Sequence, residues 1–132
     1  MRSILAVILF LGATLVAGAQ DVPDFTGTWS GKFQVIVMGR DATSEGQVQE
    51  VTITYELSKQ SGRLLWGTVL SDKTEKRPIV LAFSLNGGTL VGSDTAGFHR
   101  LTVISANRME SCVTDNGTGS IIATCGLIQK AQ

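Results

Sequence analysis

The alternation of apolar and polar residues at every second position most strongly constrains how this chain folds. In the run 51–58, Val51, Ile53, Tyr55 and Leu57 alternate with polar residues. Because successive side chains of a strand point to opposite faces, this pattern predicts a strand with one buried face. A register shift of one residue would bury a carboxylate and expose the apolar set, so the pairing is well specified. The runs 25–37 and 79–85 repeat the pattern.

Turn-forming residues divide the chain into short segments. Gly, Asn, Asp and Ser cluster between the apolar runs, and no long stretch has a helical period. The expected strands are 27–38, 47–58, 63–71, 79–85, 89–93, 98–105, 109–115 and 120–128. Short connections favour antiparallel neighbours, because parallel pairs need long crossovers. The sequence therefore predicts an all-β domain of about eight antiparallel strands in a small up-and-down barrel, with a β-sandwich as the alternative.

The connection before residue 79 is the most highly charged of the expected turns. Residues 72–77 mix acidic and basic side chains, which is typical of a solvated hairpin tip. Pro78 is expected at the head of the following strand, where a missing N–H is tolerated.

Residues 1–19 have the pattern of an export signal. A basic start at Arg2 is followed by the apolar run 4–11, and small residues at Ala17 and Ala19 suit signal peptidase. The apolar run is shorter than the roughly 20 residues that a membrane-spanning helix needs. We therefore expect a signal peptide over 1–19 and a single barrel domain over 20–132. The mature protein is expected in the periplasm or outside the cell, with no stable membrane insertion.

The two cysteines lie in the last two expected strands, and in an exported chain they are expected to form a disulfide. A two-residue loop at Thr118-Gly119 sets Cys112 opposite Cys125 at a non-hydrogen-bonded site. A turn centred on Asn116-Gly117, which is the better hairpin signal, would instead set Cys112 opposite Ile121. The spacing lacks the Cys-x-x-Cys pattern of redox or metal sites, so a structural role is favoured.

Composition and motifs exclude several classes of function. The chain carries 11 basic and 11 acidic residues, which leaves no positive surplus for nucleic-acid binding. His99 is the only histidine, which excludes multi-histidine zinc sites. A hydrolase triad of His99 with Ser93 or Asp94 lacks a Gly-x-Ser-x-Gly elbow, so a hydrogen-bonded histidine at the barrel rim is favoured. The sequence thus predicts neither an enzyme nor a bound metal or cofactor.

The aromatic residues indicate where a ligand would bind. Trp29, Phe33, Tyr55 and Phe83 belong to the apolar faces of their strands, and His99 shares a face with leucine and valine. In a closed barrel these faces line one interior, which forms either a packed core or an apolar pocket. We therefore expect these five residues at a site for a small apolar or amphipathic molecule. The alternative is a structural or protein-interaction module of the cell envelope, although outward residues such as Thr52 and Glu56 show no hydrophobic interface.

The segment 25–32, Phe-Thr-Gly-Thr-Trp-Ser-Gly-Lys, resembles the Gly-x-Trp start of lipocalins and avidin-like proteins. The resemblance covers about eight residues and the number of strands. It implies a calycin-like barrel in which Trp29 closes one end. The C-terminal half, with Gly97, the run 109–112 and the final strand, looks more like small exported prokaryotic barrels without a known activity. The resemblance therefore implies a fold and a compartment but no reaction.

Overall fold

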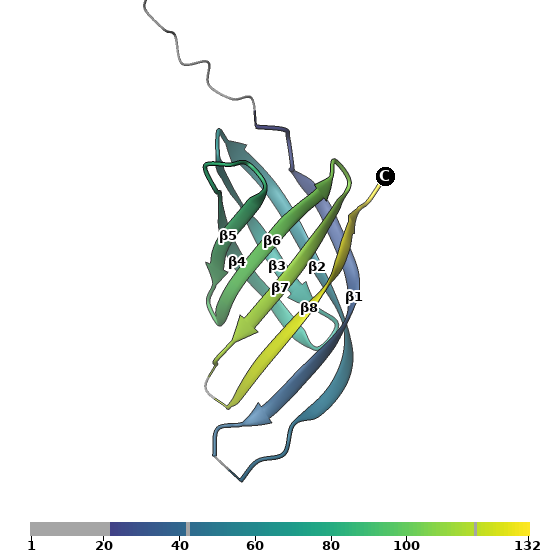
Figure 1. Cartoon of the computed structure of the whole chain (residues 1–132), viewed down its shortest axis with the longest axis vertical. Coiled ribbons are helices and arrows are strands. Elements are labelled where there is room, and N and C mark those ends of the chain that lie inside the picture. Colours follow the sequence, from purple (N-terminus) through teal and green to yellow (C-terminus); the bar gives the residue numbers. More distant parts are fainter. Residues whose placement is uncertain (1–21, 42, 118) are drawn as a thin grey trace, which may run out of the picture.

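A computed structural model describes residues 22–41, 43–117 and 119–132. The expected export signal lies outside the described residues. Each strand pairs antiparallel with its neighbours in the chain, and the last strand pairs with the first to close a barrel (Figure 1). The strands are β1 (Gly27–Gly39), β2 (Gln47–Ser61), β3 (Leu64–Ser71), β4 (Thr74–Phe83), β5 (Thr89–Asp94), β6 (Gly97–Ser105), β7 (Arg108–Asp115) and β8 (Ser120–Lys130). The predicted barrel of eight antiparallel strands is confirmed, and the sandwich alternative is wrong.

The boundaries of β4 differ from the prediction. This strand begins at Thr74, which pairs with Ser71, so the turn contains only Asp72 and Lys73. Residues 74–77 are therefore part of the sheet rather than of a solvated hairpin tip. Pro78 lies within the strand rather than at its head, on the exposed face. The charged side chains of residues 74–77 predict a loop, but the backbone of this segment pairs within the sheet.

The other end of β4 also differs. The strand ends at Phe83, and the expected inward-facing Leu85 lies in the following turn with 87% of its surface exposed. Gly87 adopts a φ of 72° in this turn, a conformation that glycine tolerates. The chain therefore leaves the sheet before the alternation reaches residue 85.

Aromatic residues fill the end of the barrel at which both ends of the described chain lie, here named the closed end. Trp29 is fully buried, and its ring centroid lies 6.0 Å from that of Phe25. Phe25 also packs against Phe83, with ring centroids 5.2 Å apart. The Trp29 indole N–H donates to the Phe25 carbonyl at 3.0 Å, and the Phe25 N–H donates to the Gln60 side chain at 3.0 Å. The segment before β1 is thus held across the barrel, and Trp29 takes part in the closure that the resemblance implies.

Inward-facing glycines let the strands coil tightly. A Cβ at Gly126 would lie 2.6 Å from the Phe33 ring, and one at Gly92 would lie 1.9 Å from the Val80 carbonyl oxygen. Both distances are shorter than van der Waals contact. Glycine at these positions therefore permits a backbone approach that a side chain would prevent.

The disulfide prediction is confirmed. Cys112 pairs with Cys125 in the β7–β8 register, and their sulfur atoms are bonded. Their Cα atoms are 4.1 Å apart, as expected for a non-hydrogen-bonded pair. The alternative register, with Cys112 opposite Ile121, is wrong.

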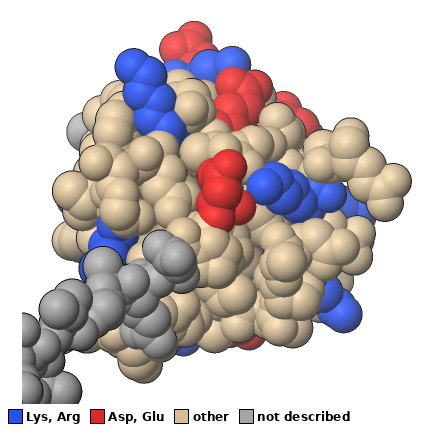
Figure 2. All heavy atoms as spheres, turned by 90° about the horizontal axis from the view of Figure 1, so that it is seen from above, with Lys and Arg blue, Asp and Glu red and all other residues tan. Residues whose placement is uncertain are grey.

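Charges are interspersed on the surface at the closed end. Figure 2 shows acidic and basic side chains scattered among uncharged residues on this face. Among the residues that the structure describes, no helix is long and apolar enough to cross a membrane.

Candidate ligand site inside the barrel

The opposite end of the barrel, here named the open end, contains a cavity of about 120 Å³. Its apolar wall is aliphatic and comes mainly from β1, β2, β7 and β8, through Val35, Val37, Val51, Ile53, Val113 and Ile122. Its polar wall lies on β3 and β4 and includes Ser71, Thr74 and Arg77. The exposed residues Gln49 and Lys73 also line it, so the cavity reaches solvent at this end. The interior is therefore filled at one end and contains a small cavity at the other.

The volume limits what this cavity accommodates. Pockets for drug-sized ligands measure roughly 300–1,000 Å³, whereas an engineered apolar cavity of about 150 Å³ holds benzene. A cavity of about 120 Å³ therefore suits a molecule of comparable size, or one end of a longer molecule.

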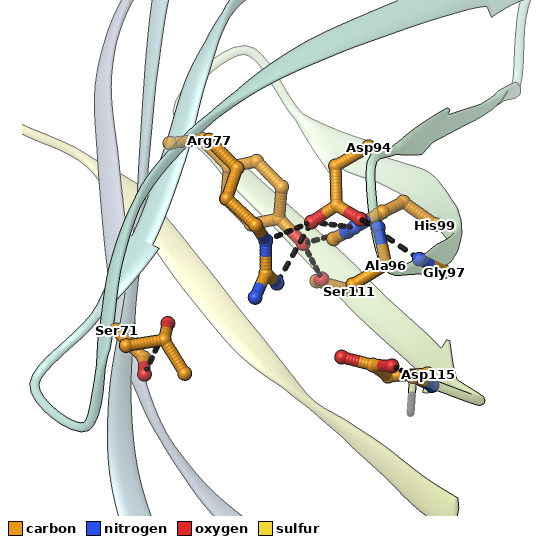
Figure 3. Close-up of polar contacts among 11 residues, drawn as sticks. Ser71, Arg77, Asp94, Ala96, Gly97, His99, Ser111 and Asp115 are labelled. Atoms are coloured by element: carbon orange, nitrogen blue, oxygen red, sulfur yellow. Dashed lines mark hydrogen bonds and ion pairs between the residues drawn. The ribbon is translucent and has the colours of Figure 1, made fainter. Parts of the chain in front are cut away.

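A buried ion pair lies beside the cavity. Arg77 of β4 contacts a single carboxylate oxygen, Oδ2 of Asp94 at the end of β5, through Nε at 2.9 Å and Nη2 at 2.8 Å (Figure 3). The Asp94 side chain is fully buried, and that of Arg77 is 26% exposed. Breaking a pair of this kind leaves an uncompensated buried charge, which costs about 3–5 kcal/mol. The pair therefore fixes the position of the guanidinium.

The turn between β5 and β6 holds Asp94 as a carboxylate. Its Oδ1 accepts hydrogen bonds from the backbone N–H groups of Ala96 at 2.7 Å and Gly97 at 2.8 Å. Burial alone would raise the pKa of Asp94, but these two bonds, with Arg77 and His99, lower it below its ordinary value. Asp94 is therefore ionised at neutral pH, which keeps Arg77 paired.

A chain of hydrogen bonds lies next to this pair in the interior. The Tyr55 hydroxyl lies 2.9 Å from His99 Nδ1 and 2.8 Å from the Ser111 hydroxyl. His99 Nε2 lies 3.3 Å from Asp94 Oδ2 without the alignment of a hydrogen bond. Since an unprotonated Nε2 would face a carboxylate with its lone pair, we assign the proton of the neutral imidazole to Nε2. Tyr55 then donates to Nδ1, and Ser111 donates to Tyr55.

Burial sets the protonation states of this chain. Desolvation lowers the pKa of His99 and outweighs the opposing effect of the Asp94 charge, so the imidazole is neutral at pH 7. Desolvation also raises the pKa of Tyr55 far above its ordinary value. The interior network therefore carries one charged pair, Arg77 with Asp94, and neutral hydrogen-bonding groups beside it.

The structure separates the five residues expected at a ligand site. Only His99 lines the cavity; it points inward, as alternation predicts, and with 3% exposure lies deeper than the expected rim position. Trp29 and Phe83 belong to the closed end. Phe33 packs over Gly126, and Tyr55 lies in the hydrogen-bond chain.

Arg77 is the residue that the sequence pattern missed. It precedes Ile79 by two positions and therefore shares the inward face of the same strand. Extending the alternation of 79–83 backward through Pro78 would have found it.

The contacts of His99 do not form a hydrolase triad. Ser93 pairs with Phe98 and, as the neighbour of the inward-facing Asp94, lies on the outer face. Ser111 bonds to Tyr55 rather than to His99. Within the described ranges, His99 therefore has no hydrogen bond to a serine or cysteine, and no cluster of metal-ligating side chains is found.

Two apolar features lie on the outside of the barrel. A shallow hollow of about 840 Å³ crosses β5–β8 over the disulfide. It lies on the outer surface rather than in the interior, because Val91, Phe98 and Arg100 in its lining are exposed. The outer apolar face, defined as the exposed residues Leu64, Trp66, Val80, Val91 and Phe98, runs over β3–β6. Trp66 pairs with Val80 in this face. The polar outward residues Thr52 and Glu56 belong to β2, so they gave no indication of this apolar face on β3–β6.

Comparisons with known proteins support the fold. No protein-family model matches the sequence, and no curated protein matches it. The solved structure of EF1p2_mFAP2b bound to DFHBI has a TM-score of 0.50 and 11% identity, covering 80% of this chain and 93% of that chain. The S-type phycobiliprotein lyase CPES from Guillardia theta has a TM-score of 0.43 and 12% identity, covering 82% of this chain and 89% of that chain. A redesigned β-barrel, b11L5F_LGL, has a TM-score of 0.46 and 18% identity, over 86% and 95% of the two chains. At a TM-score of 0.50, the first of these structures shows a likeness of fold alone.

Proposed function

We propose that this protein is an exported barrel that binds a small amphipathic molecule in the cavity at its open end. The observation that carries the proposal is the pairing of an aliphatic wall with a polar wall around about 120 Å³ of interior space. Apolar pockets with a few fixed polar groups are typical of small-molecule sites. The Arg77–Asp94 pair fixes the polar groups before a ligand arrives, which reduces the entropy lost on binding.

Export is part of the proposal. The pattern of residues 1–19 and the Cys112–Cys125 disulfide both support it, because disulfides persist in oxidising compartments. Peptide mass analysis of the protein secreted by its own host tests this part of the proposal. We expect the secreted protein to begin at Gln20. Retention of residues 1–19 in the exported protein would contradict the signal peptide.

The way in which the polar groups are engaged supports binding rather than catalysis. Tyr55 keeps its proton because its pKa is raised. Its hydroxyl is hydrogen-bonded to Nδ1 of His99, the ring nitrogen that we assign as unprotonated. Asp94 is engaged by Arg77 and by two backbone N–H groups. These groups hold one another in place and do not present an activated nucleophile to the cavity.

The test is binding of an uncharged probe, hexan-1-ol, followed by ¹H–¹⁵N NMR. We expect shifts at cavity residues such as Val113. The variant Val51→Phe fills the cavity and is expected to abolish binding, because Val51 lies in the aliphatic wall. The matched control Thr52→Phe places the same ring on the outer face and is expected to bind like the native protein. Unchanged binding by Val51→Phe would contradict the proposal, and so would failure of the native protein to bind both hexan-1-ol and the corresponding acid, hexanoate.

Native mass spectrometry of protein purified from its host provides a second test. A co-purifying small molecule that the Val51→Phe variant lacks would support the proposal. The same molecule retained by that variant would place binding outside the cavity.

The outer apolar face favours a second candidate function, a protein-interaction module. Its five members are exposed by 38% to 73%, and exposed apolar patches commonly mark interaction sites. Size-exclusion chromatography with light scattering tests whether the protein assembles with itself. An assembly that the variant Val80→Lys dissociates would favour this candidate, whereas a monomer at high concentration would remove self-association.

A further inference from the structure

The Arg77 guanidinium has an unused edge at the cavity. An arginine carries five N–H donors in a planar fork, and the two contacts with Asp94 Oδ2 use Nε and one hydrogen of Nη2. The two hydrogens of Nη1 and the second hydrogen of Nη2 have no acceptor among the described residues. Figure 3 shows this end of the side chain turned away from Asp94, toward the space between Ser71 and Asp115.

The surroundings of this edge are suited to an acid group. The Ser71 and Thr74 hydroxyls line the same cavity as Arg77 and lie 3.0 Å from each other. A carboxylate matches two parallel N–H donors of a guanidinium, and such charge-assisted bonds are about twice as strong as neutral ones. Because the guanidinium is held by Asp94, its position is fixed before the ligand binds.

The charges around the cavity set the direction of binding. Lys73 lies at the mouth on the β3–β4 turn, and no carboxylate of the described residues forms an ion pair with it. Asp115 of β7 lines the opposite side, where its Oδ1 accepts the Gly117 N–H at 2.7 Å. An anionic group is therefore attracted to the β3–β4 wall and repelled from β7.

We infer that the ligand of the proposed site is a small carboxylate with an apolar chain or ring. The carboxylate binds end-on to the unused edge of Arg77, and the apolar part lies against Val35, Val51 and Ile122. The cavity volume limits this apolar part to roughly the size of benzene. This inference rests on the proposed function and specifies the chemical class of its ligand.

A matched pair of probes tests the inference by calorimetry on the native protein. Hexanoate and hexan-1-ol have the same chain length and differ in the carboxylate. We expect hexanoate to bind roughly ten- to a hundredfold more tightly, as a charge-assisted pair of hydrogen bonds predicts. Equal affinity, or tighter binding of hexan-1-ol, would overturn the inference and leave the proposed function standing. Binding of neither probe would overturn both.

Two variants locate the contact. Arg77→Lys keeps the positive charge but loses the planar fork, so the affinity for hexanoate is expected to fall about tenfold, and to fall by more than the affinity for hexan-1-ol. The control Lys76→Met removes a charge on the outer face of the same strand, where Lys76 pairs with Glu56, and is expected to leave both affinities unchanged. Unchanged hexanoate affinity in Arg77→Lys would overturn the inference.

A measurement on the native protein does not depend on how the Arg77 variant folds. The ¹³C shift of carboxyl-labelled hexanoate reports the pKa of its acid group in the bound state. We expect that pKa to fall on binding, because a guanidinium beside a carboxylate favours the ionised form. An unchanged or raised pKa would show that the acid group lies away from Arg77.

Discussion

Mild acidification is expected to destabilise the protein through His99. This side chain is 3% exposed, and burial lowers its pKa below the ordinary value of 6.5. In the unfolded chain the imidazole takes up a proton near that ordinary value, whereas the folded protein keeps it neutral. Below this pH the unfolded state binds more protons, so the free energy of unfolding falls as the pH falls. The loss ends only where the folded imidazole also becomes protonated.

The magnitude has an upper limit. Between about pH 7.5 and about pH 5.5, a histidine that ionises only when unfolded lowers the free energy of unfolding by about 1.4 kcal/mol. His99 is the only histidine of the chain, and both cysteines are in the disulfide. No other side chain has an ordinary pKa in the middle of this range, so the pH dependence reports His99.

Urea unfolding followed by tryptophan fluorescence at the two pH values measures this loss. The variant His99→Gln is expected to lose the pH dependence between them, whatever its stability at pH 7.5. An NMR titration of the His99 ring in the native protein measures the pKa directly. A stability that is constant or rises on acidification, or a ring pKa at or above 6.5, would refute the reasoning.

Three further predictions concern the frame around the site. Gly126→Ala is expected to lower the free energy of unfolding by about 1–3 kcal/mol, because its Cβ would lie 2.6 Å from the Phe33 ring, whereas the control Gly119→Ala, with nothing within 4 Å, is expected to be neutral. Equal thermal unfolding of the two variants would contradict this. Replacing both cysteines by alanine is expected to lower the free energy of unfolding by roughly 3 kcal/mol, since the disulfide joins residues 13 apart, and an unchanged urea midpoint would show that it contributes little. Tyr55→Phe leaves the buried side chains of His99 and Ser111 without their hydrogen bonds to the hydroxyl, and is expected to lower the free energy of unfolding in denaturant by about 1–3 kcal/mol. A neutral effect would indicate that this chain of hydrogen bonds is not formed.

Arg77 shows why part of the candidate site escaped prediction. In sequence it closes a run of mixed charges, and exposed loops are the usual place for such runs. Its burial depends on an ion pair with Asp94, which is 17 residues away in the chain. The two side chains meet only because β4 pairs with β5 in a register that sets Ile79 opposite Asp94. Long-range pairing of this kind leaves no periodic signal at the residue itself.

The aromatic residues show the converse. Alternation correctly placed Trp29, Phe33, Tyr55 and Phe83 in the interior, where all four are buried. It did not distinguish the height of each residue along the barrel axis, which depends on strand tilt and on the segment before β1. Trp29 and Phe83 consequently pack in the closed end, far along the barrel from the residues that line the cavity.

The sequence by itself predicted the number of strands, their antiparallel order and the disulfide, because alternation, turn residues and cysteine spacing are local properties of the chain. Only the tertiary structure decided which end of the interior is filled and which end contains the cavity. That division depends on how eight tilted strands bring distant side chains to the same level, and on a buried charge pair whose partners meet only when the barrel has closed.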